Sequence, residues 1–145
     1  FPMEAHGDRC FSAWYGVYDR KNQRLRWAGG GHPPALLLEP TSGEAGTIAH
    51  ELGSNGPLVG MLPNMEFAAE EREINEGSRL YAYSDGAFEI ETPDGEQTKF
   101  EDFVQFMRES PSGEKSTLDL LWQRARDLRG TDALDDDFTI LEVQF

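Results

Sequence analysis

The stretch Leu80-Tyr81-Ala82-Tyr83-Ser84-Asp85-Gly86 is an apolar strand pattern that stops at an acid and a glycine. A second stretch, residues 138–145, alternates in the manner of a strand and directly follows the acidic triplet 135–137. If these two strands are antiparallel neighbours, the end of one lies beside the start of the other. The pairing would therefore bring Asp85 and the acidic triplet together at one end of a sheet.

Strand patterns also fill the first half of the chain. Residues 11–19 and 25–28 flank a polar turn and predict a hairpin, and the bulky residues on both faces of 11–19 predict that both faces are covered. The glycine- and proline-rich residues 29–34 predict a break in regular structure. Further strands are predicted at residues 35–38, 48–52 and 65–74.

Two helices are predicted between residue 85 and the last strand. Residues 99–108 place Phe103, Phe106 and Met107 on one face. Residues 116–128 place Leu120, Leu121, Ala125 and Leu128 together, with Ser116 or Thr117 as the N-cap. Strands, then helices, then a strand predict an α+β fold with antiparallel sheets rather than a doubly wound parallel sheet.

The composition excludes several classes of function. The chain has 145 residues, 38% of them apolar, and a formal net charge of −14, which disfavours binding to nucleic acids or anionic lipid surfaces. No apolar run approaches the roughly 20 residues of a membrane span. The single cysteine, Cys10, excludes a disulfide within the chain and favours a reducing, cytoplasmic location.

Converging carboxylates repel one another, and a hard divalent cation is the usual remedy. Mg²⁺ and Mn²⁺ favour oxygen ligands, so metal-assisted hydrolysis of a phosphate ester is the reaction class that this arrangement predicts. The alternative is structural, because an Asp-Gly pair after a strand is most often a turn and an acidic triplet is usually a solvated loop.

The sequence resembles the metal-dependent protein phosphatases of type 2C, in particular their bacterial branch of sporulation stage II and sigma-factor-regulating phosphatases. The resemblance rests first on Tyr83-Ser84-Asp85-Gly86 and, far downstream, Asp136-Asp137-Phe138-Thr139-Ile140. It extends in order along almost the whole chain through the hairpin at residues 15–28, Gly31-His32-Pro33-Pro34-Ala35-Leu36-Leu37, Gly56-Pro57-Leu58-Val59-Gly60, Glu76-Gly77-Ser78-Arg79-Leu80 and Thr92-Pro93-Asp94-Gly95-Glu96.

The resemblance implies a sandwich of two antiparallel sheets flanked by helices, in four αββα layers. It implies two Mn²⁺ or Mg²⁺ ions in the intact domain and direct attack of water on phosphoserine or phosphothreonine, without a phosphoenzyme. Asp85 and Asp136 would bind the same metal. Asp137 is a third candidate, either as a ligand or through contacts around the ligands, while Asp135 falls outside the motif and is expected to be a solvated acid.

Some parts of the family pattern have no counterpart here. The aspartate that bridges both metals, the two amino-terminal helices and the first strands are missing, and Asp8 in His6-Gly7-Asp8 stands in the wrong place to replace that aspartate. Residues 1–145 are therefore expected to be the carboxyl-terminal part of one phosphatase domain, inactive alone and with one sheet face exposed. His32 is either a phosphate contact or, as we favour, a loop residue bonded to the backbone.

The predicted function is hydrolysis of phosphoserine or phosphothreonine on a regulatory protein in bacterial signalling. The resemblance implies a substrate of the anti-sigma-factor antagonist type and a sensor or receiver domain upstream in the parent chain. The alternative is a non-catalytic, phosphatase-like module that binds a protein partner. A calcium-binding module ranks lower, because the acids lack the spacing of a calcium loop.

Overall fold

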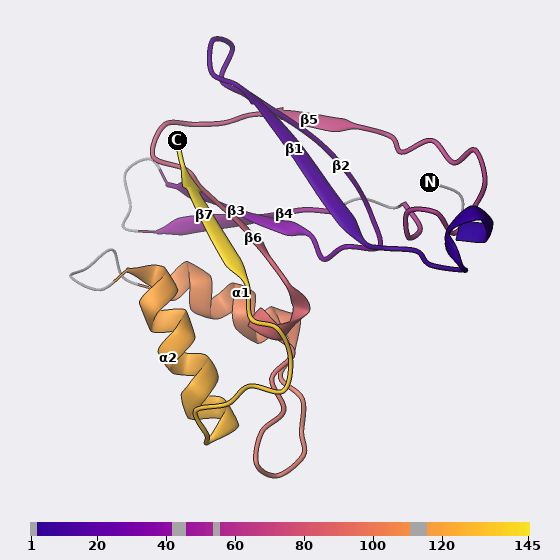
Figure 1. The fold of residues 1–145 in the computed structure, drawn as a ribbon. Coiled ribbons are helices and arrows are strands. Elements are labelled where there is room, and N and C mark those ends of the chain that lie inside the picture. The colour runs from indigo at the N-terminus through magenta and orange to yellow at the C-terminus, as the bar shows by residue number, and fades with distance from the viewer. Residues whose placement is uncertain (1–2, 42–45, 54–55, 111–115) are drawn as a thin grey trace.

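The computed structural model describes residues 3–41, 46–53, 56–110 and 116–145, whose strands form two antiparallel sheets (Figure 1). The first sheet has the order β1 (Ala13–Asp19), β2 (Arg24–Gly30), β5 (Glu70–Glu73). The second has the order β4 (Thr47–Leu52), β3 (Ala35–Pro40), β6 (Arg79–Tyr83), β7 (Ile140–Gln144). The helices are η1 (Met3–His6), η2 (Asp85–Ala87), α1 (Phe100–Glu109) and α2 (Thr117–Arg129).

The three-stranded sheet lies over one face of the four-stranded sheet, and α1 and α2 lie under the other face (Figure 1). The prediction of an α+β fold with two antiparallel sheets and helices is confirmed. The further helices that would make four layers are not among the described residues. No helix of the described chain is long and apolar enough to cross a membrane.

The alternation of side chains along β3 builds two separate cores. Leu36 and Leu38 point toward the helices and pack with Phe103, Met107 and Leu121. Residues of β3 with the opposite orientation face the other sheet, in a core that contains Leu25, Trp27, Ala35, Leu37, Leu52, Ile74 and Leu80. β3 is therefore covered on both faces, whereas the edge strand β7 leaves Leu141 and Val143 59% and 39% exposed.

The sequence accounts well for α2. Ser116 is the N-cap, because its side chain accepts a hydrogen bond from the backbone N–H of Asp119 at 3.1 Å. Of the apolar face predicted from Leu120, Leu121, Ala125 and Leu128, Leu121 and Ala125 are buried and the other two are half-buried. Gly130 ends the helix in the left-handed region at φ 74°, where glycine has no steric penalty.

The prediction that both faces of the first strand are covered is wrong. The strand becomes β1 at the edge of the three-stranded sheet, and Tyr15 and Val17 on its outer face are 70% and 51% exposed. The helices of the described chain pack against the other sheet, so these side chains have no covering layer there. The expected exposure of one sheet face is observed.

Two predicted boundaries also need correction. Gly29 and Gly30 do not break the structure but extend β2, where they pair with Trp14 and Ala13 of β1. The strand predicted at residues 65–74 is shortened to β5, which pairs with Arg24 to Trp27 of β2; at the far end of β2, Gly30 is bridged to Gly56 instead. The residues before β5 consequently form a loop.

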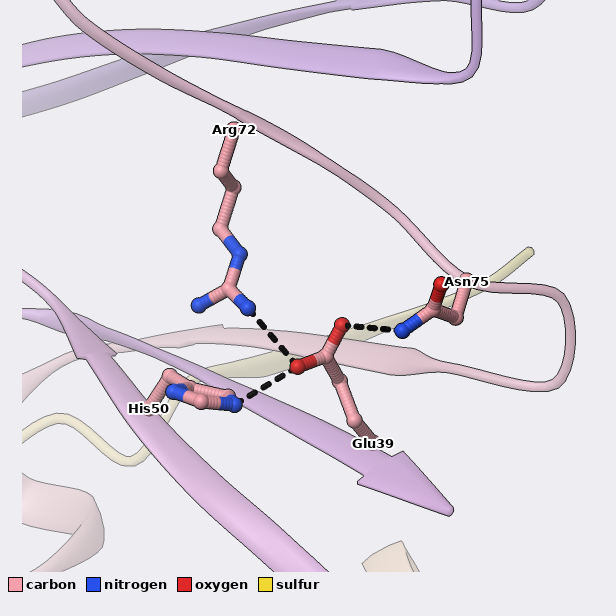
Figure 2. A network of polar contacts seen from close by, with 4 residues as sticks. All are labelled: Glu39, His50, Arg72 and Asn75. Carbon is pink, nitrogen blue, oxygen red and sulfur yellow. Dashed lines mark hydrogen bonds and ion pairs between the residues drawn. The ribbon is translucent and has the colours of Figure 1, made fainter. Parts of the chain in front are cut away.

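A buried carboxylate joins the two sheets at one end of the sandwich (Figure 2). Glu39 of β3 accepts hydrogen bonds from Arg72 Nη2 at 2.7 Å and Asn75 Nδ2 at 3.2 Å. His50 Nε2 lies 2.6 Å from Glu39 Oε2, a close contact rather than a well-directed hydrogen bond. The Glu39 side chain is only 8% exposed, so three nitrogen partners replace most of its water.

Candidate metal centre

The end of β6 and the start of β7 meet as the sequence predicts. The two strands are antiparallel with Tyr83 opposite Ile140, and the pairing continues beyond the strands. The backbone N–H of Ser84 donates to the carbonyl of Thr139 at 3.0 Å. The Ser84 hydroxyl donates to the carbonyl of Asp137 at 2.6 Å and accepts from the N–H of Thr139 at 2.9 Å. Ser84 thus fastens the two segments together immediately beside Asp85.

Gly86 permits the closest approach between the two segments. A Cβ atom at this position would lie 2.6 Å from the carbonyl oxygen of Asp137 and 3.4 Å from the carbonyl carbon of Asp136. Real side chains do not tolerate the shorter distance, so only glycine fits without a shift of the backbone. The backbone of the Asp-Gly turn therefore lies directly against the backbone of the acidic triplet.

Asp85 and Asp136 are held in matching local arrangements. Asp85 begins the short helix η2, and its Oδ1 accepts from the N–H of Gly86 at 3.1 Å. Asp136 Oδ1 accepts from the N–H of Asp137 at 2.7 Å. Both residues are exposed, and no contact within the described chain is recorded for Oδ2 of either carboxylate. The hydrogen bond to Oδ1 orients each side chain, and Oδ2 can bind a ligand.

The donors at this site suit a hard divalent cation. Two carboxylates on adjoining segments are oxygen ligands of the kind that Mn²⁺ and Mg²⁺ prefer, and a partly hydrated ion needs only one or two of them. Asp137 is exposed and stands beside them in the chain. Among the described residues no group of three or more histidine, cysteine, aspartate or glutamate side chains could hold a metal. The residues present thus fit a part of a metal site.

Asp135 is exposed, as the sequence suggests, but it also pairs with a cationic side chain. Its Oδ1 lies 2.7 Å from Nη2 of Arg129, in the last turn of α2. Arg129 Nη1 also donates to the carbonyl of Glu91 at 3.3 Å. The sequence gives little warning of these contacts, because a separation of six residues across a helix end follows no helical spacing.

The loop before β3 is held to the end of β6 by Tyr83. The Tyr83 hydroxyl donates to the carbonyl of Pro34 at 2.6 Å. Burial, and secondarily the negative charge of Glu51, raises the pKa of Tyr83 far above its usual value, so the hydroxyl keeps its proton. His32 Nδ1 lies 2.8 Å from the carbonyl of Pro33, which favours the backbone-bonded role over a phosphate contact.

Comparisons with known proteins place the chain in a family. The family model for stage II sporulation protein E (SpoIIE) matches residues 2–145. Protein IcfG of Synechocystis sp. is 31% identical over 120 residues, which are 81% of this chain and 18% of that protein. Phosphoserine phosphatase RsbP of Bacillus subtilis is 33% identical over 78 residues, or 54% of this chain and 18% of that protein. The chain therefore spans less than a fifth of each of these relatives.

Solved structures show the same fold at lower identity. The SiaA-PP2C domain of Pseudomonas aeruginosa matches 99% of this chain and 64% of that chain, with a TM-score of 0.72 and 18% identity. The RsbU and RsbW domains of a Mycobacterium tuberculosis protein match 98% of this chain and 38% of theirs, with a TM-score of 0.69 and 19% identity. The phosphatase domain of SpoIIE from Bacillus subtilis matches 92% and 57%, with a TM-score of 0.64 and 15% identity. With the family model covering nearly every residue, the chain belongs to the SpoIIE family, and it shares its fold with these solved PP2C and phosphatase domains.

Proposed function

We propose that residues 1–145 are the carboxyl-terminal part of one phosphatase domain and supply Asp85 and Asp136 to its divalent-metal site. The observation that carries this proposal is the close contact between residues 84–86 and 136–139. The Ser84 hydroxyl hydrogen-bonds across this contact, and Gly86 allows it because it has no side chain. It holds two exposed carboxylates on adjoining segments, where their charges are not compensated by a cationic side chain of the described chain.

The cation would be Mn²⁺ or Mg²⁺, two of them in the complete domain. When bound, such ions supply Lewis-acid charge for the phosphoryl group and lower the pKa of a water molecule. The role of this chain is to bind and orient: the N–H groups of Gly86 and Asp137 each hold one oxygen of a ligating carboxylate. Asp137 would add a further negative charge beside the site.

The proposed reaction is hydrolysis of phosphoserine or phosphothreonine on a regulatory protein in the bacterial cytoplasm. One relative is named a phosphoserine phosphatase, and one solved structure that shares the fold is described as the phosphatase domain of SpoIIE. A phosphorylated regulator of the anti-sigma-factor antagonist type is the proposed substrate, with a sensor or receiver domain upstream in the parent protein. The net charge of −14 is unfavourable for nucleic acid as a partner.

A second candidate is a phosphatase-like module that binds a protein partner without turnover. It is favoured by the number of candidate ligands, since no group of three or more histidine, cysteine, aspartate or glutamate side chains among the described residues could hold a metal ion. The two functions differ in what lies upstream: a further aspartate in a glycine-rich turn there would complete a binuclear site, and its absence would leave a weak site for one ion.

The deciding experiment uses the longer domain that contains this chain. We expect Mn²⁺-dependent hydrolysis of a phosphoserine peptide and of an aryl phosphate. Asp85→Asn and Asp136→Asn should each lower kcat/KM by at least about a hundredfold, because residues that only support a metal ligand already account for about 10–100-fold. Glu71→Gln, on the exposed surface of β5, is the matched control. Unchanged turnover in both aspartate variants would refute the site.

A further inference from the structure

The segment that delivers Asp136 to the site is tied to the end of α2. After Gly130 the chain turns, and two arginines of the last helical turn reach acids beyond it. Arg126 pairs with Asp132, and Arg129 pairs with Asp135, the residue directly before Asp136. The two pairs look equivalent in the sequence, but they differ in their surroundings.

Arg129 is the more enclosed of the two arginines. Its side chain is 23% exposed, against 34% for Arg126, and its Nε atom is buried. The acid that it holds is 53% exposed, whereas Asp132 is 87% exposed. Arg126 therefore makes an ordinary surface ion pair, of a kind that contributes little to stability.

Arg129 also reaches the segment that follows Asp85. One nitrogen, Nη1, donates to the carbonyl of Glu91, while the other, Nη2, holds Asp135. Pro93 lies against the same helix end, since its Cγ is 3.0 Å from the position of a Cβ at Gly130. A planar guanidinium with two parallel N–H groups can serve both partners at once, which a lysine ammonium cannot do with the same geometry.

Between Glu91 and Asp85 the chain is short and well anchored. Residues Ala87, Phe88 and Ile90 are buried, and the N–H of Glu89 donates to the carbonyl of Asp85 at 2.8 Å. A displacement of Glu91 is therefore transmitted to Asp85 through packed residues. On the other side Asp135 is joined to Asp136 by a single peptide bond.

We propose that Arg129 is a positioning residue for the metal site: it joins Glu91, on the Asp85 side, to Asp135, on the Asp136 side, and fixes the spacing of the two carboxylates. Ser84 joins the same segments from the sheet, and Arg129 joins them from the helix. The part of this inference that concerns metal binding rests on the proposed function. The mechanical part, that Arg129 holds the segments of Glu91 and Asp135 together, does not.

The mechanical part is tested on this chain without metal, by amide hydrogen exchange. Arg129→Gln should speed exchange about three- to tenfold at Glu89 and at Thr139, whose N–H groups report the two segments, because local openings become more frequent. Arg126→Gln, on the same helical turn, is the matched control and should leave both amides within about twofold. Equal exchange in the two variants would overturn the inference.

The metal part is tested on the longer domain by titration with Mn²⁺. Arg129→Gln should weaken Mn²⁺ binding about three- to tenfold, at or below the lower end of the effect of groups bonded directly to a ligand. Arg129→Lys should recover part of the loss through Asp135, and Arg126→Gln should bind as the parent does. Full Mn²⁺ affinity in Arg129→Gln would overturn the positioning role. If the parent itself bound no Mn²⁺, the proposed function would fail, and the exchange rates would still decide whether Arg129 couples the two segments.

Discussion

Two groups of carboxylates in this molecule differ in burial and in the partners of their charges. Glu39 is buried between the sheets and surrounded by Arg72, His50 and Asn75 (Figure 2). Asp85 and Asp136 are exposed, lie on adjoining segments and receive hydrogen bonds from backbone N–H groups. The charge of Glu39 is compensated within the described chain, so its task is to hold the fold together. The charges of Asp85 and Asp136 are left for a ligand.

The most damaging change to stability should be the loss of charge at Glu39. Glu39→Gln leaves Arg72 without its anion and places an amide N–H₂ among donors, so we expect a loss of about 2–3 kcal/mol in the free energy of unfolding. This is below the roughly 3–5 kcal/mol of a fully buried pair because Arg72 is 27% exposed. Urea denaturation measures it, with Glu71→Gln in the exposed pair with Arg24 as the control.

A loss of less than about 0.5 kcal/mol at Glu39 would mean that the buried network is replaceable, and the contrast between the two carboxylate groups would lose its basis. The control should itself change stability by less than about 0.5 kcal/mol, because both partners are half exposed.

An intermediate effect is expected at Ser84. Ser84→Ala removes a hydroxyl that makes hydrogen bonds to both the carbonyl of Asp137 and the N–H of Thr139. We expect a loss of about 1–2 kcal/mol, since each group left without its partner carries a desolvation cost. Thermal denaturation gives the stability. Ser84→Thr keeps the hydroxyl and should recover most of the loss; a threonine variant as unstable as the alanine variant would speak against the hydrogen bonds as the cause.

The smallest effect, and one of different sign, is expected at the exposed carboxylates without metal. Asp136→Asn is the same chemical change as Glu39→Gln, but it removes a negative charge from among like charges. We expect stability to be unchanged or raised by up to about 0.5 kcal/mol, measured in urea with a chelator present. A loss as large as that of Glu39→Gln would show that Asp136 is a structural residue.

The sequence predicts most of the frame of this site. The alternation in the two final strands and the glycine after Asp85 suffice to predict that Asp85 and Asp136 converge, because antiparallel pairing leaves little freedom. The cap at Ser116 is equally local. The length of the strand within residues 65–74 is not local, since Gly56 and not residues 65–69 is bridged to the end of β2 at Gly30.

The contacts that tune the site depend on tertiary structure. Glu39 follows an apolar strand and looks like the first surface residue, yet Arg72 from the other sheet makes its burial possible. The contact between Arg129 and Asp135 depends on the path of the chain from Gly130 to Asp135, and not on a local sequence pattern. The outer face of β1 is exposed because no helix of the described chain packs on it. The pattern of apolar residues within 11–19 cannot predict whether such a helix is present.

The dual orientation of β3 makes the two cores interdependent. Successive leucines of one strand belong to different cores, Leu36 and Leu38 to one and Leu37 to the other. Neither core can melt while the other stays intact, because the same backbone would have to be ordered for one and free for the other. The molecule should therefore lose both cores in one cooperative transition. A substitution that disturbs the packing between the helices and β3 should also destabilise the core between the two sheets.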